Sequence, residues 1–221
     1  MNEALFPNET KPYRAARNRL LRAEIALRRR VEKVAAMRRK LPAGGKVPQD
    51  YAFEEGAPPR AVRLSELFGE RDTLVAYSFM YGPRMEKACP MCTSMLDGLD
   101  GNARHIAQRA NLVVIAKSPI ARILEYARGR GWSNLRLLSS AGSSYNADYH
   151  GESAEGGQLP MLNVFVRRKG AIRHFYGTEL LFAKADPGQN NRHVDAIWPL
   201  WNLLDYTPEG RGRDWYPKLQ Y

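Results

Sequence analysis

The chain has 221 residues, of which 44% are hydrophobic and 10% aromatic, a composition that excludes a chain disordered throughout. This length accommodates one domain with a sizeable core and one appended element. The formal net charge of +11 would indicate an acidic partner if it were spread over the surface. It is concentrated instead, because residues 11–40 contain twelve Lys or Arg against Glu24 and Glu32, and the remainder is close to neutral.

The sequence has no recognisable targeting or membrane segment. The opening MNEALFPNET is polar, and an arginine-rich stretch follows it where a secretory signal would have an apolar core. Apolar runs stay well short of the roughly 18 residues that cross a bilayer. We therefore expect no membrane contact and a cytoplasmic location. In that reducing compartment, a pair of cysteines favours redox or metal chemistry over a structural disulfide.

Residues 13–41 contain no Pro or Gly and consist mostly of good helix formers. Apolar residues recur there every seven positions, at Leu20, Leu27, Val34 and Leu41. The pattern predicts a long amphipathic helix, and we assign residues 1–45 to a basic helical extension. Its apolar face favours packing or a homodimer, whereas nucleic-acid binding is disfavoured because aromatic residues are not interleaved with the basic ones.

Residues 46–205 alternate between short apolar or β-branched runs and helical patterns. Strands are expected at 73–79, 111–116 and 135–139, helices at 90–110 and 119–130, a hairpin at 159–166 and 171–177, and a final helix at 195–204. Before these elements, we expect a mostly loop-like stretch that contains an edge strand at 61–63 and a helical turn opened by Ser65. This alternation predicts an α/β domain with parallel strands and right-handed crossovers. Residues 206–221 form an irregular aromatic tail.

Both cysteines lie at the start of the helix that follows the first main strand, in the sequence KACPMC. Unpaired backbone N–H groups and the positive end of the helix dipole favour a thiolate at Cys89. Pro90 suits the first helical position, where its missing N–H costs nothing. Cys92 is three residues further on, so it returns to the same face and can attack a mixed disulfide at Cys89. The spacing predicts Cys89 as the nucleophile and Cys92 as the resolving thiol.

Other interpretations of the cysteine pair were weighed. A zinc site needs two more ligands, and the four histidines contain no pair at the usual H-x₃₋₅-H spacing. A c-type haem is excluded, because Thr93 and not His follows Cys92. Two inert buried thiols on a helix are the remaining alternative. We therefore expect neither a cofactor nor a bound metal.

The order of strand, C-x-x-C helix, strand, helix, strand, loop, proline-led hairpin and final helix resembles the thioredoxin-like fold. That fold is a central mixed sheet flanked by helices in three layers, and the resemblance covers most of residues 60–205. Its first hairpin strand begins with a cis-proline that packs against the redox pair, and Pro160 in QLPMLNVFV matches that position. The resemblance thus adds Pro160 to the site residues.

Two further stretches, the long loop 80–88 and NLRLLSSAGSSYNADYHG, resemble peroxiredoxins more than thioredoxins. Peroxiredoxins bind peroxide with a Thr three residues before the attacking cysteine, and Glu86 departs from that pattern. Across the chain, the basic helix, YSFMYGPRMEKACPMCTSMLDGLDG and LWNLLDYTPEGRGRDWYPKLQY resemble a bacterial thioredoxin-like family catalogued as a domain of unknown function, related to the thioredoxin and peroxiredoxin superfamily.

Together these features predict a thiol-disulfide oxidoreductase that uses Cys89 and Cys92. Its partners would be a protein or small-molecule disulfide and an external thiol reductant. The alternative is a non-catalytic thioredoxin-like module for binding or dimerisation. A thiol peroxidase fits less well because of Glu86.

Overall fold

The computed structural model describes residues 5–42, 44–212 and 215–220. The chain divides into two units, Met1–Pro42 and Ala43–Tyr221. The first holds α1 (Lys11–Arg39), which begins after Thr10, whose side chain accepts a hydrogen bond from the Tyr13 N–H at 3.3 Å. Two arginines in its last turn suit the negative end of the helix dipole. Among the described residues, no helix is long and apolar enough to cross a membrane.

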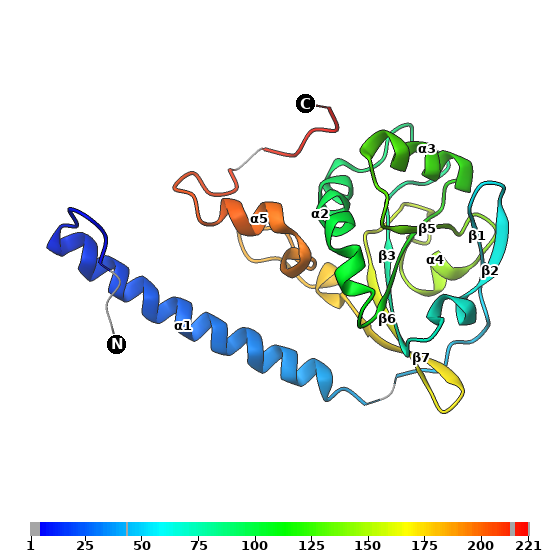
Figure 1. Ribbon diagram of the computed structural model, residues 1–221, viewed down its shortest axis with the longest axis horizontal. Coiled ribbons are helices and arrows are strands. Elements are labelled where there is room, and N and C mark those ends of the chain that lie inside the picture. Colours follow the sequence, from blue (N-terminus) through cyan, green and yellow to red (C-terminus); the bar gives the residue numbers. More distant parts are fainter. Residues whose placement is uncertain (1–4, 43, 213–214, 221) are drawn as a thin grey trace. The chain divides into compact units, whose positions relative to one another are not determined.

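The described part of the second unit is built on one mixed sheet with the strand order β2-β1-β5-β4-β3-β6-β7 (Figure 1). The strands are β1 (Ala52–Glu55), β2 (Arg60–Arg63), β3 (Thr73–Ser78), β4 (Asn111–Ala116), β5 (Arg136–Ser139), β6 (Leu162–Arg168) and β7 (Ala171–Gly177). The central strands β3, β4 and β5 run parallel, and β6 lies antiparallel to β3 and β7. The helices are α2 (Pro90–Ile106), α3 (Ile120–Arg130), α4 (Tyr145–Asp148) and α5 (Pro199–Leu204). Three 3₁₀ turns, η1 (Leu64–Phe68), η2 (Glu179–Phe182) and η3 (Asp195–Ile197), complete the described elements.

The alternation of side chains along the central strands creates a core on each face of the sheet. Val114 and Ala116 face a core shared with α2, α3 and α5. Val113 and Ile115 face the opposite core, which includes residues of η1 and α4. Helices thus cover both faces, and the architecture is the thioredoxin-like fold in three layers. Figure 1 shows α2 between α5 and the sheet.

Close approach of α5 to α2 depends on a glycine within α2. A Cβ atom built on Gly98 would lie 3.3 Å from the ring of Pro199, the first residue of α5. Trp198 then reaches α2 by donating its indole N–H to Ser94 Oγ at 2.9 Å. The C-terminal end of the domain is therefore fastened directly to the helix that begins at the cysteines.

Three local predictions were wrong. Residues 52–55 form a strand, because Phe53 and Glu55 are buried on alternate positions and the segment pairs with both β2 and β5. The Gly/Ser-rich stretch before the hairpin contains the short helix α4, which buries Tyr145. The expected helix at 195–204 is interrupted at Trp198, because Pro199 has no N–H to continue it and instead starts α5.

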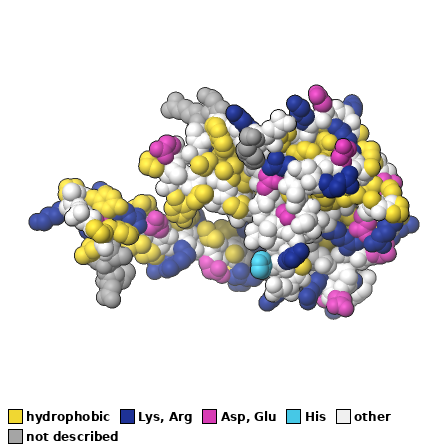
Figure 2. All heavy atoms as spheres, turned by 45° about the horizontal axis from the view of Figure 1, so that its top comes forward, with side chains coloured by type: hydrophobic (Ala, Val, Ile, Leu, Met, Phe, Trp, Pro, Cys, Tyr) yellow, Lys and Arg dark blue, Asp and Glu magenta, His cyan; other side chains and the backbone are white. Residues whose placement is uncertain are grey.

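The surface of the second unit carries charges of both signs. On the face shown in Figure 2, basic and acidic side chains are interspersed over this unit. That distribution agrees with the near-neutral charge of the sequence after residue 40.

The link between α2 and β5 gives a test of stability. Asp100 is 9% exposed and accepts hydrogen bonds from the N–H groups of Asn134 and Leu135, at 2.8 and 3.1 Å. Asp100→Ala should lower the free energy of unfolding by about 2 kcal/mol, because both N–H groups lose their acceptor. Urea unfolding measures this, with the exposed Glu70→Ala as control. An equal loss in both variants would contradict this role of Asp100.

Candidate active site

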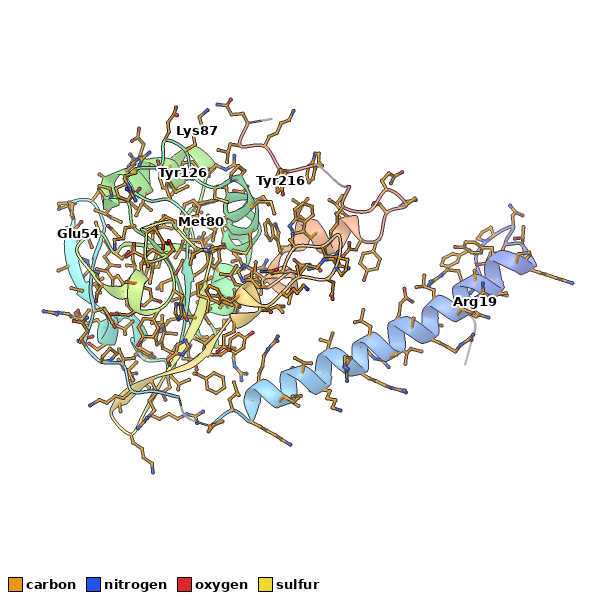
Figure 3. All side chains as sticks on the ribbon, turned by 180° about the vertical axis from the view of Figure 1, so that it is seen from behind. Arg19, Glu54, Met80, Lys87, Tyr126 and Tyr216 are labelled. Carbon is orange, nitrogen blue, oxygen red and sulfur yellow. The ribbon has the colours of Figure 1, made fainter. Side chains whose placement is uncertain are left out.

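Cys89 occupies the position just before the first turn of α2, with Pro90 as the first helical residue. Its N–H donates to the Met80 carbonyl at 3.1 Å, which ties it to the loop after β3. Its carbonyl accepts from both the N–H and the hydroxyl of Thr93, at 3.0 and 2.9 Å. Met80 is labelled in Figure 3 and is partly exposed. The backbone of Cys89 is therefore fixed on both sides while its side chain stays partly exposed.

Cys92 lies deeper, with 2% of its surface exposed. Its sulfur accepts a hydrogen bond from the Tyr77 hydroxyl at 3.1 Å. Tyr77 belongs to β3 and is itself 1% exposed, so the donor cannot turn away to solvent. Both cysteines are free thiols in this structure.

The environment separates the two thiols electrostatically. A hydrogen bond from the Cys92 thiol, with further bonds from the N–H groups of Cys92 and Met91, outweighs burial and lowers the pKa of Cys89 to about 6. The same bond to Cys89, together with burial and the nearby negative charge, raises the pKa of Cys92 well above its usual range. At neutral pH the pair is a thiolate at Cys89 and a proton-bearing thiol at Cys92.

Tyr77 remains protonated beside this pair. Burial, followed by the charges of Cys92 and Cys89, raises the pKa of its phenol well above the ordinary value. Its O–H is therefore a permanent donor to Cys92 and lowers the pKa of that thiol, opposing the stronger effects that raise it. Sequence reasoning did not select Tyr77, because nothing in TLVAYSF marks one aromatic residue as facing the cysteines.

Both sulfurs line a cavity of about 420 Å³, and Pro160 lines it as well. The structure thus brings Cys89, Cys92 and Pro160 to one place. The predicted cis geometry at Pro160 is wrong, because in the described chain a cis peptide bond occurs at Ala57–Pro58, while Leu159–Pro160 is trans. Pro160 still lies beside the cysteines, as predicted. The reason is that β6, which follows Pro160, pairs with β3, the strand that contains Tyr77.

Glu86 does not line this cavity. Glu86 and Lys87 are exposed and line a separate hollow with Tyr81 and Tyr126. Figure 3 shows Lys87 and Tyr126 near one another at that side of the unit. Proximity in sequence to Cys89 therefore does not put the Glu86 carboxylate in the cysteine pocket.

The far wall of the cavity comes from residues 181–198, between η2 and α5, and was not predicted as part of the site. Its residues are mostly polar and irregular in sequence, a pattern typical of an ordinary loop. Across the described residues, no group of three His, Cys, Asp or Glu side chains is placed to hold a metal ion.

The chain was compared with models of known protein families. A family described as "Bacterial protein of unknown function (DUF899)" matches residues 4–221. The chain belongs to this family. A search of curated proteins finds no match.

Solved structures similar to this DUF899 chain include peroxiredoxins and thioredoxins. Peroxidoxin BcpB from Mycobacterium tuberculosis is 20% identical, with 72% of this chain and 95% of that chain covered and a TM-score of 0.47. Reduced 2-Cys peroxiredoxin from Plasmodium vivax is 17% identical over 74% and 96%, with a TM-score of 0.47. The lipoprotein thioredoxin Etrx1 from Streptococcus pneumoniae is 13% identical over 67% and 98%, with a TM-score of 0.41. At such identities and scores, these likenesses carry no information on activity.

The lowered pKa of Cys89 predicts a pH profile. Because the thiolate is the reactive form, the alkylation rate of Cys89 by iodoacetamide should rise with pH, with a midpoint at about 6, and level off above it. Mass spectrometry of the alkylated chain assigns the reaction to Cys89. A midpoint at the ordinary value of 9.0 would contradict the hydrogen-bonded thiolate.

The Tyr77 contact predicts a separate effect on the second thiol. Tyr77→Phe removes the donor that lowers the pKa of Cys92, so a mixed disulfide at Cys89 should persist about tenfold longer before Cys92 displaces it. Acid quenching and mass spectrometry measure that lifetime. Tyr81→Phe is the matched control, since Tyr81 is buried in the same core but is not placed against either sulfur. Equal lifetimes in the two variants would remove Tyr77 from this role.

Proposed function

We propose that the chain is a thiol-disulfide oxidoreductase in which Cys89 is the nucleophile and Cys92 the resolving thiol. The observation that supports it most is the asymmetry of the pair in a shared cavity. Cys89 is partly exposed and has its pKa lowered to about 6, whereas Cys92 is buried and keeps its proton. Attack requires an accessible thiolate, and resolution requires a neighbouring thiol, so the two environments match two successive roles.

The reaction proceeds in two exchanges. The Cys89 thiolate attacks one sulfur of a substrate disulfide, forming a Cys89–substrate disulfide and releasing the other sulfur as a thiolate. Cys92 then loses its proton, attacks the Cys89 sulfur and releases the second substrate thiol, leaving a Cys89–Cys92 disulfide. An external dithiol reductant resets the pair by reducing this bond. Each cycle moves two electrons from the reductant to the substrate.

Pro160 would act as a positioning residue in this scheme, because it lines the cavity beside both sulfurs. The alternative of two inert buried thiols fits less well, since burial alone raises a thiol pKa and Cys89 shows the opposite shift. A non-catalytic binding module would not need this asymmetry.

We place this activity in the cytoplasm, where reductants keep such a pair in the thiol form. Dimerisation through the basic extension, residues 1–45, stays a prediction from the heptad spacing of its apolar residues. The same holds for the boundaries 46–205 and 206–221.

Substitution of each cysteine should give a different result. Cys89→Ser should abolish reduction of a disulfide substrate, because no other thiolate faces the cavity among its described lining residues. Cys92→Ser should still attack but accumulate the mixed disulfide at Cys89, because the resolving thiol is gone. Mass spectrometry after mixing with hydroxyethyl disulfide distinguishes the two. Circular dichroism checks that both variants fold.

Full disulfide reduction by Cys89→Ser would contradict the proposal. So would a Cys92→Ser variant that forms no adduct although it is folded.

A further inference from the structure

We infer that the substrate of the cysteine pocket is a small, uncharged disulfide with apolar substituents, and not a disulfide on the surface of a folded protein. The inference rests on the proposed oxidoreductase activity and specifies its substrate class. It comes from the wall that residues 181–198 build opposite the two sulfurs.

The wall is fastened to the domain at both ends. Just before its start, Thr178 forms two hydrogen bonds with Leu162 of β6: the Thr178 N–H donates to the Leu162 carbonyl at 3.0 Å, and the Thr178 hydroxyl accepts from the Leu162 N–H at 3.1 Å. At its end, Trp198 donates to Ser94 of α2 at 2.9 Å and is 6% exposed. The two anchors lie on the strand that follows Pro160 and on the helix that follows Cys89, so the wall is set against both sides of the site.

The wall is also braced within itself. The Asn191 amide donates to the Leu181 carbonyl, and His193 Nδ1 lies 3.2 Å from the Thr178 hydroxyl. The Asn202 amide of α5 donates to the Asp195 carbonyl at 2.7 Å. A segment held by its own side chains in this way forms a cavity before any ligand arrives. The wall narrows the approach to the partly exposed Cys89, and a small disulfide fits this approach better than the surface of a folded protein does.

The volume and the lining residues of the cavity favour a small apolar ligand. About 420 Å³ is within the range of pockets that enclose small molecules. The cavity is lined by polar side chains within residues 189–195 and by carbon and thioether side chains, those of Met80, Met91, Pro160, Leu181, Val194 and Trp198. Apolar substituents on the two sulfurs of a disulfide would be buried against these groups.

The charges of the pocket argue against an anionic disulfide. Of the described residues that line it, Arg192 and Asp195 carry opposite charges and lie 4.0 Å apart. Asp195 also pairs with Arg211 at 2.7 Å, and Arg211 pairs in turn with Asp205 at 2.5 Å. Burial lowers the pKa of His193, which keeps its ring neutral at neutral pH. Of the described lining residues, Arg192 is the one permanent cation, and Asp195 faces it at 4.0 Å, so a ligand with carboxylates would lose water beside the Cys89 thiolate for one cation that is already opposed.

The test compares two disulfides that differ in charge and in two ester methyl groups. Pre-reduced protein is mixed with dithiodipropionate or with its uncharged dimethyl ester, and loss of the Cys89 and Cys92 thiols is followed by alkylation and mass spectrometry. The rates at which dithiothreitol reduces the same two disulfides are measured as well. Their ratio gives the intrinsic difference in reactivity between the ester and the dicarboxylate. The ester should be preferred by at least about tenfold beyond that reference, and reduced protein should react with insulin more slowly than with the ester.

A pocket variant locates the preference. Leu181→Trp should fill the cavity and slow the reaction with the ester by about tenfold, whereas hydroxyethyl disulfide, which is smaller, should be affected less. Leu180→Trp is the matched control, because Leu180 is 53% exposed and is not among the residues that line the cavity. If Leu181→Trp does not fold, Leu181→Ala replaces it, and its lost apolar contact should reduce the preference for the ester.

Three results would overturn the inference: a corrected ester preference near one, equal effects at positions 180 and 181, or oxidation by insulin as fast as by the ester. Failure of every disulfide, insulin included, would instead reject the oxidoreductase activity itself and the substrate class with it.

Discussion

The electrostatic interaction between the two cysteine side chains is the one on which the rest of the site depends. It stabilises a thiolate at Cys89 and makes loss of the proton from Cys92 harder, so one contact assigns opposite protonation states to two chemically identical groups. Such an interaction needs the two side chains on one face of α2, which the C-x-x-C spacing supplies. Burial of Cys92, which lies against Tyr77 of β3, raises its pKa further.

Two neighbouring strands of the sheet, β3 and β6, position the groups that surround the two cysteines. β3 supplies Tyr77, whose buried hydroxyl donates to Cys92, and the loop after it supplies the Met80 carbonyl that holds the Cys89 N–H. β6 pairs with β3 and follows Pro160, which brings that proline to the cavity. The helix dipole, the strand and the hairpin therefore act on the same few atoms, although they are far apart in sequence.

The wall of residues 181–198 affects which disulfides can reach the partly exposed Cys89. Thr178 and Trp198 fasten it to β6 and α2, so the partly exposed Cys89 lies in a preformed cavity that this wall helps to line. A thiolate on an open surface reacts with any disulfide it encounters, whereas one in a cavity can favour disulfides of a given size and charge. Enclosure therefore links the packing of the C-terminal segment to the specificity of the proposed reaction.

The sequence by itself determined the α/β alternation, the helix that begins at Pro90 and the placement of Cys89 before it, because these depend on local patterns of apolar residues and on capping chemistry. It also marked Pro160 as a neighbour of the cysteines through its resemblance to a known fold. Tertiary structure decided the trans bond at Pro160, the strand at 52–55, the Tyr77 contact and the wall over the pocket. The Tyr77 contact and the wall depend on residues distant in the chain, and a local sequence pattern does not indicate which distant side chain will pack against it.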